Sequence, residues 1–318
     1  MANNTRSILR YPGSKARFCE LISSTISMNS GHPRVFVEPF CGGASVSIAL
    51  LEDGIVDEIA INDVDPLIGN FWNVIFSLNN AIWLSQKVLT VPLTIDEWQR
   101  QKKLIPKNSR EWALKCLYLN RTSFNGILHK AGPLGGWGQK NITIDIRFNR
   151  NKLSHRILEL SQLREKVSVS NEDWKTFCKR MAKNPSTIFY LDPPYLHKAE
   201  QLYGYIFDVD KHEELRNYLQ KLQRPWMLSY DDATDIRDLY AGLSLNARVI
   251  DNTYSTHPLG GASFVGRELF YTNMKKLPAP AKTGSAHIGL SVKAVGKSKA
   301  PVGIPIRFPI STAAANAI

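Results

Sequence analysis

Short apolar segments alternate with helix-like segments along most of the chain. Two apolar runs, residues 35–37 and 59–61, end in polar or glycine-rich turns, and residues 45–51 between them carry a helical pattern. The same alternation returns in the second half of the chain. We expect strands at residues 35–37, 59–61, 188–191, 225–230 and 268–272, and helices at residues 45–51 and 211–223. This order predicts an α/β fold with a mostly parallel sheet and helices on both faces.

Residues 67–150 interrupt this alternation. Helical patterns occupy residues 68–78, 95–103 and 110–119, and no convincing strand lies between them. The simplest interpretation is a helical insertion between two parts of one sheet domain, residues 1–66 and 151–274. Residues 275–318 are rich in Lys, Ala, Pro, Gly and Ser without a periodic apolar face, so we predict a disordered basic tail.

The positive charge of the chain is partly concentrated in this tail. The 318 residues carry a net charge of +12, and residues 275–318 hold seven Lys or Arg and no acid. Removing those seven charges from +12 leaves +5 on the body of the chain. A nucleic-acid partner is compatible with this charge, but basic solubility alone would give the same count.

The sequence lacks the signals of membrane, secreted and metal-binding proteins. No apolar run approaches the ~20 residues of a membrane span, and the amino-terminal segment has no signal-peptide centre. We therefore expect a cytoplasmic protein. The four cysteines, Cys19, Cys41, Cys116 and Cys178, lack CxxC spacing, so we predict reduced thiols and no metal site.

The first two predicted strands end in turns suited to a nucleoside ligand. EPFCGGAS at residues 38–45 contains Gly42 and Gly43, which let a backbone approach a ligand closely before a helix start. Asp63 follows the second strand, where a carboxylate can hold the two hydroxyls of a ribose. The alternatives are an ordinary structural turn for the glycines and a helix cap for the acid, because Asp65-Pro66 is also a good helix start.

A third turn, Asp192-Pro193-Pro194-Tyr195, directly follows an apolar strand. A nucleobase amine is a poor nucleophile because its lone pair is drawn into the ring. Two acceptors, the Asp192 carboxylate and the Pro193 carbonyl held by a donor-free Pro-Pro unit, would localise that lone pair, and Tyr195 would stack on the base. The alternative is a rigid turn without catalytic function.

Six ordered motifs make residues 8–273 resemble the Dam-type, D12 class DNA adenine-N6 methyltransferases. Asp-Pro-Pro-Tyr alone is only moderately specific, whereas the ordered set is highly specific. The motifs are RYPGSK at 10–15, FVEPF at 36–40 with the paired glycines, ND at 62–63, LNRTSFNG at 119–126, DPPY at 192–195 and ELFYTN at 268–273.

This resemblance implies a Rossmann-like methyltransferase sheet and a helical target-recognition insertion at residues 67–150. It implies S-adenosylmethionine as cofactor and an adenine flipped out of double-stranded DNA as target. The implied cofactor-binding residues are Tyr11 and Lys15 in the pocket, Glu38, Gly42 and Gly43 near the methionine moiety, Asp63 on the ribose, Asp173 beside the cofactor adenine, and Asp192.

The segment after Asn125-Gly126 departs from many relatives, which continue with a basic loop containing asparagine. Here ILHKAGPLGGWGQK follows at residues 127–140, so the target sequence is not predicted. Its glycines, tryptophan and lysines suit a mobile DNA-contacting hairpin, and the alternative is an ordinary flexible loop. Arg121 fits either a phosphate contact or an internal pair with an acid. The candidate DNA-binding residues are Arg121, Asn125, Lys130, Trp137 and Lys140.

Three functions compete at this point. The first is methylation of adenine N6 in DNA, the second is the same chemistry on adenine in RNA, and the third is a DNA-binding regulator with a vestigial site. Intact Lys15, Asp63 and Asp192 argue against decay of the site. The sequence is compatible with a monomer but fixes no oligomeric state, and a restriction-modification partner is not decided.

Overall fold

The structure of the chain is a computed structural model. It describes residues 6–10, 15–29, 34–195, 207–254, 264–279 and 292–293. Tyr11, one of the predicted cofactor-pocket residues, lies outside these ranges. Among the described residues, no helix is both long and apolar enough to cross a membrane.

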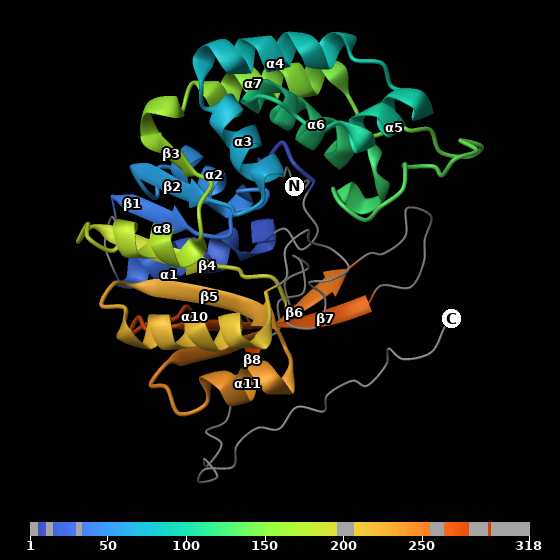
Figure 1. The fold of residues 1–318 in the computed structure, drawn as a ribbon. Helices are drawn as coiled ribbons and strands as arrows, with labels where there is room; N and C mark the ends of the chain where they lie inside the picture. The colour runs from blue at the N-terminus through green and yellow to red at the C-terminus, as the bar shows by residue number, and fades with distance from the viewer. Residues whose placement is uncertain are drawn as a thin grey trace.

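One eight-stranded sheet runs through the molecule in the order β3-β2-β1-β4-β5-β7-β6-β8 (Figure 1). The strands β3, β2, β1, β4 and β5 are parallel, and β7, β6 and β8 pair antiparallel beyond them. This confirms the predicted α/β class with a Rossmann-like sheet. The strands are β1 Val35–Glu38, β2 Glu58–Asn62, β3 Val167–Ser170, β4 Thr187–Leu191, β5 Trp226–Asp231, β6 Asn246–Tyr254, β7 Phe264–Thr272 and β8 Val292–Lys293.

Alternate residues of the central strands face two separate hydrophobic cores. In β4, Ile188 and Tyr190 belong to one core, while Phe189 and Leu191 belong to the other. A strand buried on both faces needs apolar residues at every position, which explains the continuous run that ends at Asp192. The strand therefore delivers Asp192 to the carboxyl edge of the sheet.

Helices cover both faces, as predicted. The first core packs α1, α2 and α3 against the sheet, and the second packs α8, α10 and α11 (Figure 1). The α-helices are α1 Cys19–Asn29, α2 Ser45–Glu52, α3 Pro66–Ile75, α4 Leu78–Thr90, α5 Ile95–Lys103, α6 Ser109–Thr122, α7 Arg150–Ser161, α8 Trp174–Met181, α10 Val209–Lys221 and α11 Thr234–Tyr240; the 3-10 helices are η1 Lys15–Phe18, η2 Phe124–Gly126 and η3 Arg164–Lys166.

Five α-helices, α3 to α7, lie between β2 and β3 in the chain. Three of them were expected at nearly these positions, whereas α4 and α7 were not. Helix α7 packs along α4, so the helical segment extends past the expected limit of residue 150. The prediction that this helical segment is a domain separate from the sheet stays a prediction, because the segment and the sheet contribute side chains to one core.

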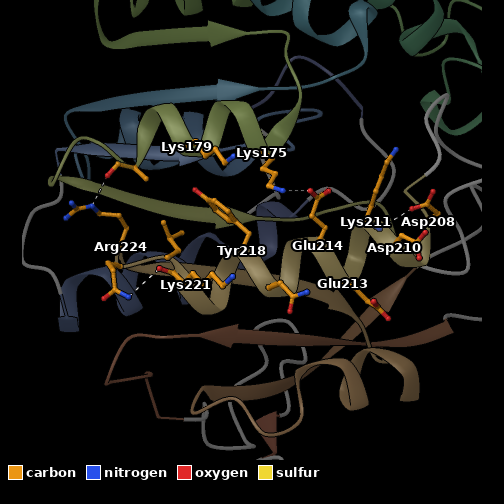
Figure 2. A pocket seen from close by; sticks show the side chains of 14 residues that line it. Lys175, Lys179, Asp208, Asp210, Lys211, Glu213, Glu214, Tyr218, Lys221 and Arg224 are labelled. Carbon is orange, nitrogen blue, oxygen red and sulfur yellow. Dashed lines mark hydrogen bonds and ion pairs between the residues drawn. The ribbon is translucent and has the colours of Figure 1, made fainter. Parts of the chain in front are cut away.

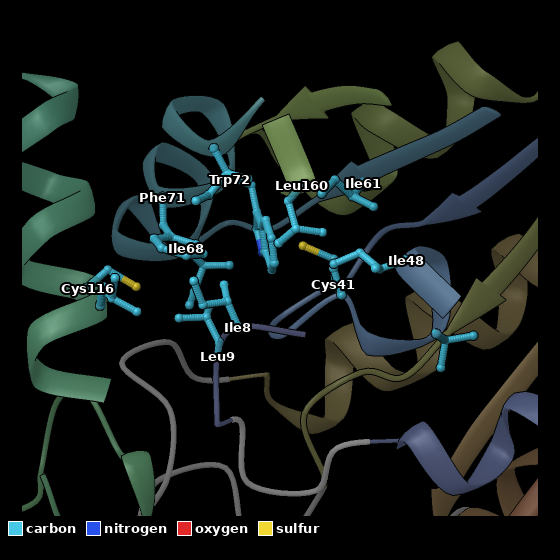
Figure 3. Close-up of a cluster of buried hydrophobic side chains, with 14 of the residues drawn as sticks. Ile8, Leu9, Cys41, Ile48, Ile61, Ile68, Phe71, Trp72, Cys116 and Leu160 are labelled. Atoms are coloured by element: carbon cyan, nitrogen blue, oxygen red, sulfur yellow. The ribbon is translucent and has the colours of Figure 1, made fainter. Parts of the chain in front are cut away.

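Trp72 of α3 is one of the large side chains of that shared core. The Trp72 side chain is fully buried and lies in one cluster with Ile61 from β2 and Cys41 from the glycine turn (Figure 3). Its indole Nε1 donates a hydrogen bond of 2.9 Å to the Gly42 carbonyl. The first inserted helix is therefore attached directly to the turn that follows β1.

The beginning of the basic tail contacts the sheet domain. Asn29 at the end of α1 exchanges two hydrogen bonds with the backbone of Lys276, at 2.7 and 2.8 Å. The strand β8 pairs with β6 through Val292 and Lys293. These contacts differ from the predicted absence of structure in residues 275–318. The remaining tail, residues 280–291 and 294–318, lies outside the described residues.

Candidate active site

Three acids stand at the carboxyl ends of adjacent parallel strands. Glu38 ends β1, Asp63 follows β2 and Asp192 follows β4. Because β2, β1 and β4 are neighbours and parallel, their ends meet at one edge of the sheet. This is the edge where open α/β sheets bind ligands. The topology thus gathers three predicted site residues.

The glycine turn and Asp63 hold each other in place. The Gly42 amide donates to Asp63 Oδ2 at 2.9 Å, and the Asp65 amide donates to Asp63 Oδ1 at 3.0 Å. Gly42 has a φ of 44°, in the region that favours glycine. Asp65, not Asp63, caps helix α3 by accepting from the Leu67 amide at 2.9 Å. The helix-cap alternative therefore applies to Asp65, and Asp63 remains available for a role at the turn.

The carboxyl group of Glu38 is almost completely removed from water. It accepts a hydrogen bond from the Ser47 hydroxyl on α2. Burial, with a smaller contribution from the nearby Asp192 and Asp63, raises the pKa of Glu38 to about 8. Burial and the neighbouring Asp65 raise the pKa of Asp63 to about 7. Both groups would be stabilised as anions by a cation or by hydrogen-bond donors placed between them.

Asp173 occupies the turn after β3. Its side chain is exposed and caps α8 by accepting from the amides of Lys175 and Thr176, at 2.9 and 3.3 Å. The same turn is tied to the ends of β1 and β2, because Asn62 Nδ2 donates to the Pro39 and Glu172 carbonyls at 3.0 and 3.1 Å. A contact of Asp173 with the cofactor adenine stays a prediction.

Asp192 lies at the centre of a hydrogen-bonded network. The Lys15 ammonium is 2.9 Å from Asp192 Oδ2 and 2.6 Å from the Tyr195 hydroxyl. The Ser229 hydroxyl on β5 donates to Asp192 Oδ1 at 2.8 Å and is itself bonded to Tyr190 at 2.9 Å. The structure therefore brings together Lys15, Asp192 and Tyr195, which belong to two separate sequence motifs.

The network also contains Glu268 from β7, with Oε2 3.4 Å from the Lys15 ammonium. Burial alone would lower the pKa of Lys15, but Asp192, Tyr195 and Glu268 reverse this effect and raise it well above its usual value. Burial raises the pKa of Asp192, and the Lys15 charge opposes that rise. Lys15 is thus a permanent cation that favours the ionised form of Asp192.

Sequence reasoning missed Ser229 and Glu268 as site residues. The signal of Ser229 is a polar residue after the apolar start of β5, WMLSYD, and that of Glu268 is its place in the ELFYTN motif on β7. Pro193 and Pro194, which were predicted, follow Asp192 directly; Pro193 is buried and Pro194 is half-buried. The role of the Pro193 carbonyl as a second acceptor stays a prediction.

The five candidate DNA-binding residues fall into two groups. Asn125, Lys130, Trp137 and Lys140 are exposed on the segment after α6, and the Trp137 ring meets the Trp98 ring edge-on at 5.6 Å. Arg121 is partly buried, and its guanidinium donates to the Ile8 carbonyl. Its internal partner is a main-chain carbonyl and not an acid, and a contact of Arg121 with a DNA phosphate stays a prediction.

A residue of this segment that was not singled out, His129, connects it to the sheet edge. His129 Nε2 lies 2.6 Å from Asp65 Oδ2, two positions after Asp63. The Lys102 ammonium on α5 donates to the carbonyls of Leu128 and His129, at 2.9 and 2.7 Å. The exposed candidate DNA-binding residues therefore stand on a segment that is anchored beside the acids.

A groove of about 990 Å³ lies between α8 and α10 and contains none of the predicted site residues (Figure 2). Both basic and acidic side chains line it, and Lys175 forms an ion pair with Glu214. Opposite charges of this kind do not favour a polyanion. The sheet edge, and not this groove, therefore stays the candidate active site.

A sequence model of the D12 class N6 adenine-specific DNA methyltransferases matches residues 11–256. The chain belongs to this family. The match contains the glycine turn, Asp63 and the Asp192 turn, and it confirms the resemblance drawn from the motifs. A search of curated proteins found no match. The methyltransferase has, among its described residues, no cluster of three His, Cys, Asp or Glu side chains that could hold a metal ion.

Proposed function

We propose that the methyltransferase transfers a methyl group from S-adenosylmethionine to the N6 amine of an adenine flipped out of a specific double-stranded DNA sequence. Membership of the family supports adenine methylation of DNA. The observation that carries the finer proposal is the meeting of Asp63, Glu38 and Asp192 at one sheet edge. At such an edge Asp63 and Glu38 can face a nucleoside cofactor, while Asp192 can face a reacting amine.

The residues present suit this cofactor, which supplies an activated methyl group on a positively charged sulfur. The Asp63 carboxylate is oriented by two amides and would accept hydrogen bonds from ribose hydroxyls. The paired glycines allow close backbone approach before α2, whose N-cap residue Ala44 has no side-chain oxygen. Glu38, with a raised pKa, would be favoured as an anion by a nearby cation.

The Asp192 turn would act on the target amine. As positive charge grows on the attacking nitrogen, its N–H bonds become stronger donors, so Asp192 would bind the transition state more tightly than the ground state. The Lys15 ammonium at 2.9 Å favours the ionised form of the carboxylate, which is the form that accepts hydrogen bonds. Tyr195, which contacts Lys15 through its hydroxyl, would stack on the base.

Labelled S-adenosylmethionine incubated with duplex DNA or with RNA tests this function. The expected result is label in duplex DNA, recovered after digestion as N6-methyl-deoxyadenosine. Label in RNA would favour the RNA enzyme instead. Duplex binding without transfer to either substrate would favour a vestigial regulator.

The pH dependence of cofactor affinity tests the assignment of Asp63. In the free protein its pKa is raised to about 7, and hydrogen bonds from ribose hydroxyls would favour the ionised form. Binding should therefore release a proton below pH 7, and the affinity should weaken as pH falls through about 7, by up to about tenfold per pH unit for one group. Calorimetric titration from pH 6 to 8.5 in two buffers with different ionisation enthalpies measures the released proton.

Asp63→Asn is the matched variant for this experiment, because the amide keeps one acceptor but cannot titrate. It should bind more weakly at pH 8 and lose the part of the pH dependence below pH 7. Proton release that is unchanged in Asp63→Asn would remove Asp63 from the ribose site.

The basic tail should strengthen DNA binding without setting sequence preference, because neutralisation of phosphates is blind to sequence. After residue 279 the tail holds five basic residues and no acid: Lys282, Lys293, Lys297, Lys299 and Arg307. Replacing these five with glutamine keeps the chain that forms β8. For every phosphate that the tail no longer neutralises, the slope of the logarithm of the DNA-binding constant against the logarithm of the salt concentration should become less steep by ~0.9. An unchanged slope would mean that the tail does not bind DNA.

A further inference from the structure

Lys15 lies between two carboxylates from different strands. Asp192 follows β4 and its Oδ2 is 2.9 Å from the ammonium, whereas Glu268 on β7 has Oε2 at 3.4 Å. The two pairs differ in exposure: the side chains of Lys15 and Glu268 are 4% and 1% exposed, and that of Asp192 is 20% exposed. The ammonium and Glu268 are therefore inside the protein, and Asp192 is the member of the trio that a ligand can reach.

Both carboxylate oxygens of Asp192 already accept hydrogen bonds. Oδ2 accepts from Lys15 and Oδ1 from the Ser229 hydroxyl. A target amine must therefore displace or share one of these donors. The Ser229 hydroxyl is held in the sheet by its hydrogen bond with Tyr190. Lys15, in contrast, has a second carboxylate nearby, that of Glu268. Lys15 is the donor that can move without being left as an uncompensated buried charge, a strongly unfavourable state.

We propose that Glu268 is a positioning residue that takes over the Lys15 ammonium when the target amine binds Asp192 Oδ2. The inference rests on the proposed function, since it assumes that Asp192 receives the amine. In the structure the Lys15 ammonium lies between Asp192 and Glu268 and is closer to Asp192. On substrate binding the lysine moves toward Glu268, Ser229 keeps Oδ1 in place, and Oδ2 becomes available.

Removing the charge of Glu268 should then hold Lys15 on Asp192. In Glu268→Gln the ammonium loses this second carboxylate and stays with Asp192, so the amine competes poorly for Oδ2. We expect the single-turnover rate, measured with saturating cofactor and duplex DNA, to fall roughly 10- to 100-fold, as for other misplaced reacting groups. Dissociation constants for cofactor and DNA should stay within about twofold of wild type, because neither ligand binds Glu268.

The pH profile of the same rate separates this role from a structural one. The negative charge of Glu268 raises the pKa of Asp192, so its removal should move the acid limb of the rate to lower pH while the plateau falls. The described groups that face or electrostatically influence Asp192 are Lys15 on η1, Glu38 on β1, Tyr190 on β4, Tyr195, Ser229 and Tyr230 on β5, and Glu268 on β7. The substitution Glu268→Gln changes the charge of only one of these groups.

Two variants serve as controls. Glu268→Asp keeps the charge and should recover part of the rate. Asp232→Asn removes another nearly buried carboxylate, one residue after the end of β5, which pairs with Arg237 at 2.6 Å, and should lower stability without slowing methyl transfer.

The outcomes distinguish this inference from the proposed function. A wild-type protein that does not methylate adenine overturns the proposed function. A wild-type rate in Glu268→Gln, beside an inactive Asp192→Ala, overturns the role of Glu268 alone. A slow Glu268→Gln whose acid limb does not move, or whose ligand affinities fall in parallel, also overturns it, because the defect would then be structural.

Discussion

Replacing Asp192 with alanine is expected to slow methyl transfer by ~10²- to 10³-fold, about 3 to 4 kcal/mol of transition-state stabilisation. The carboxylate is a charged acceptor held by Ser229 at 2.8 Å and Lys15 at 2.9 Å, so its effect should lie near the upper end of that range. The fold should survive, because the buried Lys15 still has Glu268 at 3.4 Å. Single-turnover methylation of duplex DNA measures the reduction in rate.

Asp192→Asn is the matched control, because its amide keeps one carbonyl acceptor without the charge. We expect it to lose less rate than Asp192→Ala. Equilibrium binding of DNA should change little in either variant, since phosphate contacts elsewhere supply most of the affinity. Near wild-type transfer by Asp192→Ala, or a defect explained entirely by weaker cofactor binding, would show that Asp192 is not the acceptor.

Replacing Trp72 with alanine is expected to destabilise the methyltransferase by about 3 to 5 kcal/mol. The indole is fully buried and packs against Phe71 and Phe76, with ring centroids 4.9 and 5.9 Å away. Its removal leaves a large cavity and also leaves the buried Gly42 carbonyl without its indole donor. The free energy of unfolding from urea titration measures the effect.

Trp72→Phe separates packing from the hydrogen bond. The smaller ring keeps most of the apolar packing, so the decrease in stability should be well below that of alanine. It cannot donate to Gly42, and we expect cofactor affinity to fall because the glycine turn is less firmly held. An unfolding midpoint of Trp72→Ala equal to that of wild type would mean that the inserted helices do not depend on this residue.

The sequence could predict Asp63 and Asp192 at the sheet edge because each belongs to a local pattern, whereas the role of Glu38 came from the family resemblance. An apolar run followed by Asp192 or Asp63 fixes both the strand and its end, and parallel neighbours then bring those ends together. Lys15 came from the family resemblance alone. Its position beside Asp192 depends on packing across 177 residues of chain, which no local pattern encodes.

The elements that were missed have weak local signals. The strand β3, VSVS, is only partly buried at the edge of the parallel strands, so it lacks a continuous apolar run. Glu268 and Ser229 become neighbours of Asp192 only through the pairing of β4 with β5 and of β5 with the antiparallel β7. His129 lies in a short stretch without regular structure and contacts Asp65, which is 64 residues earlier in the chain. Each of these interactions follows from tertiary packing.

A crystal structure of the methyltransferase with a duplex containing its target sequence and with S-adenosylhomocysteine tests the central claim most directly. We expect an adenine outside the double helix, with N6 within hydrogen-bond distance of the Asp192 carboxylate and the Pro193 carbonyl, and the cofactor ribose held by Asp63. An adenine that stays stacked in the duplex, or an N6 amine that faces other residues, would contradict it.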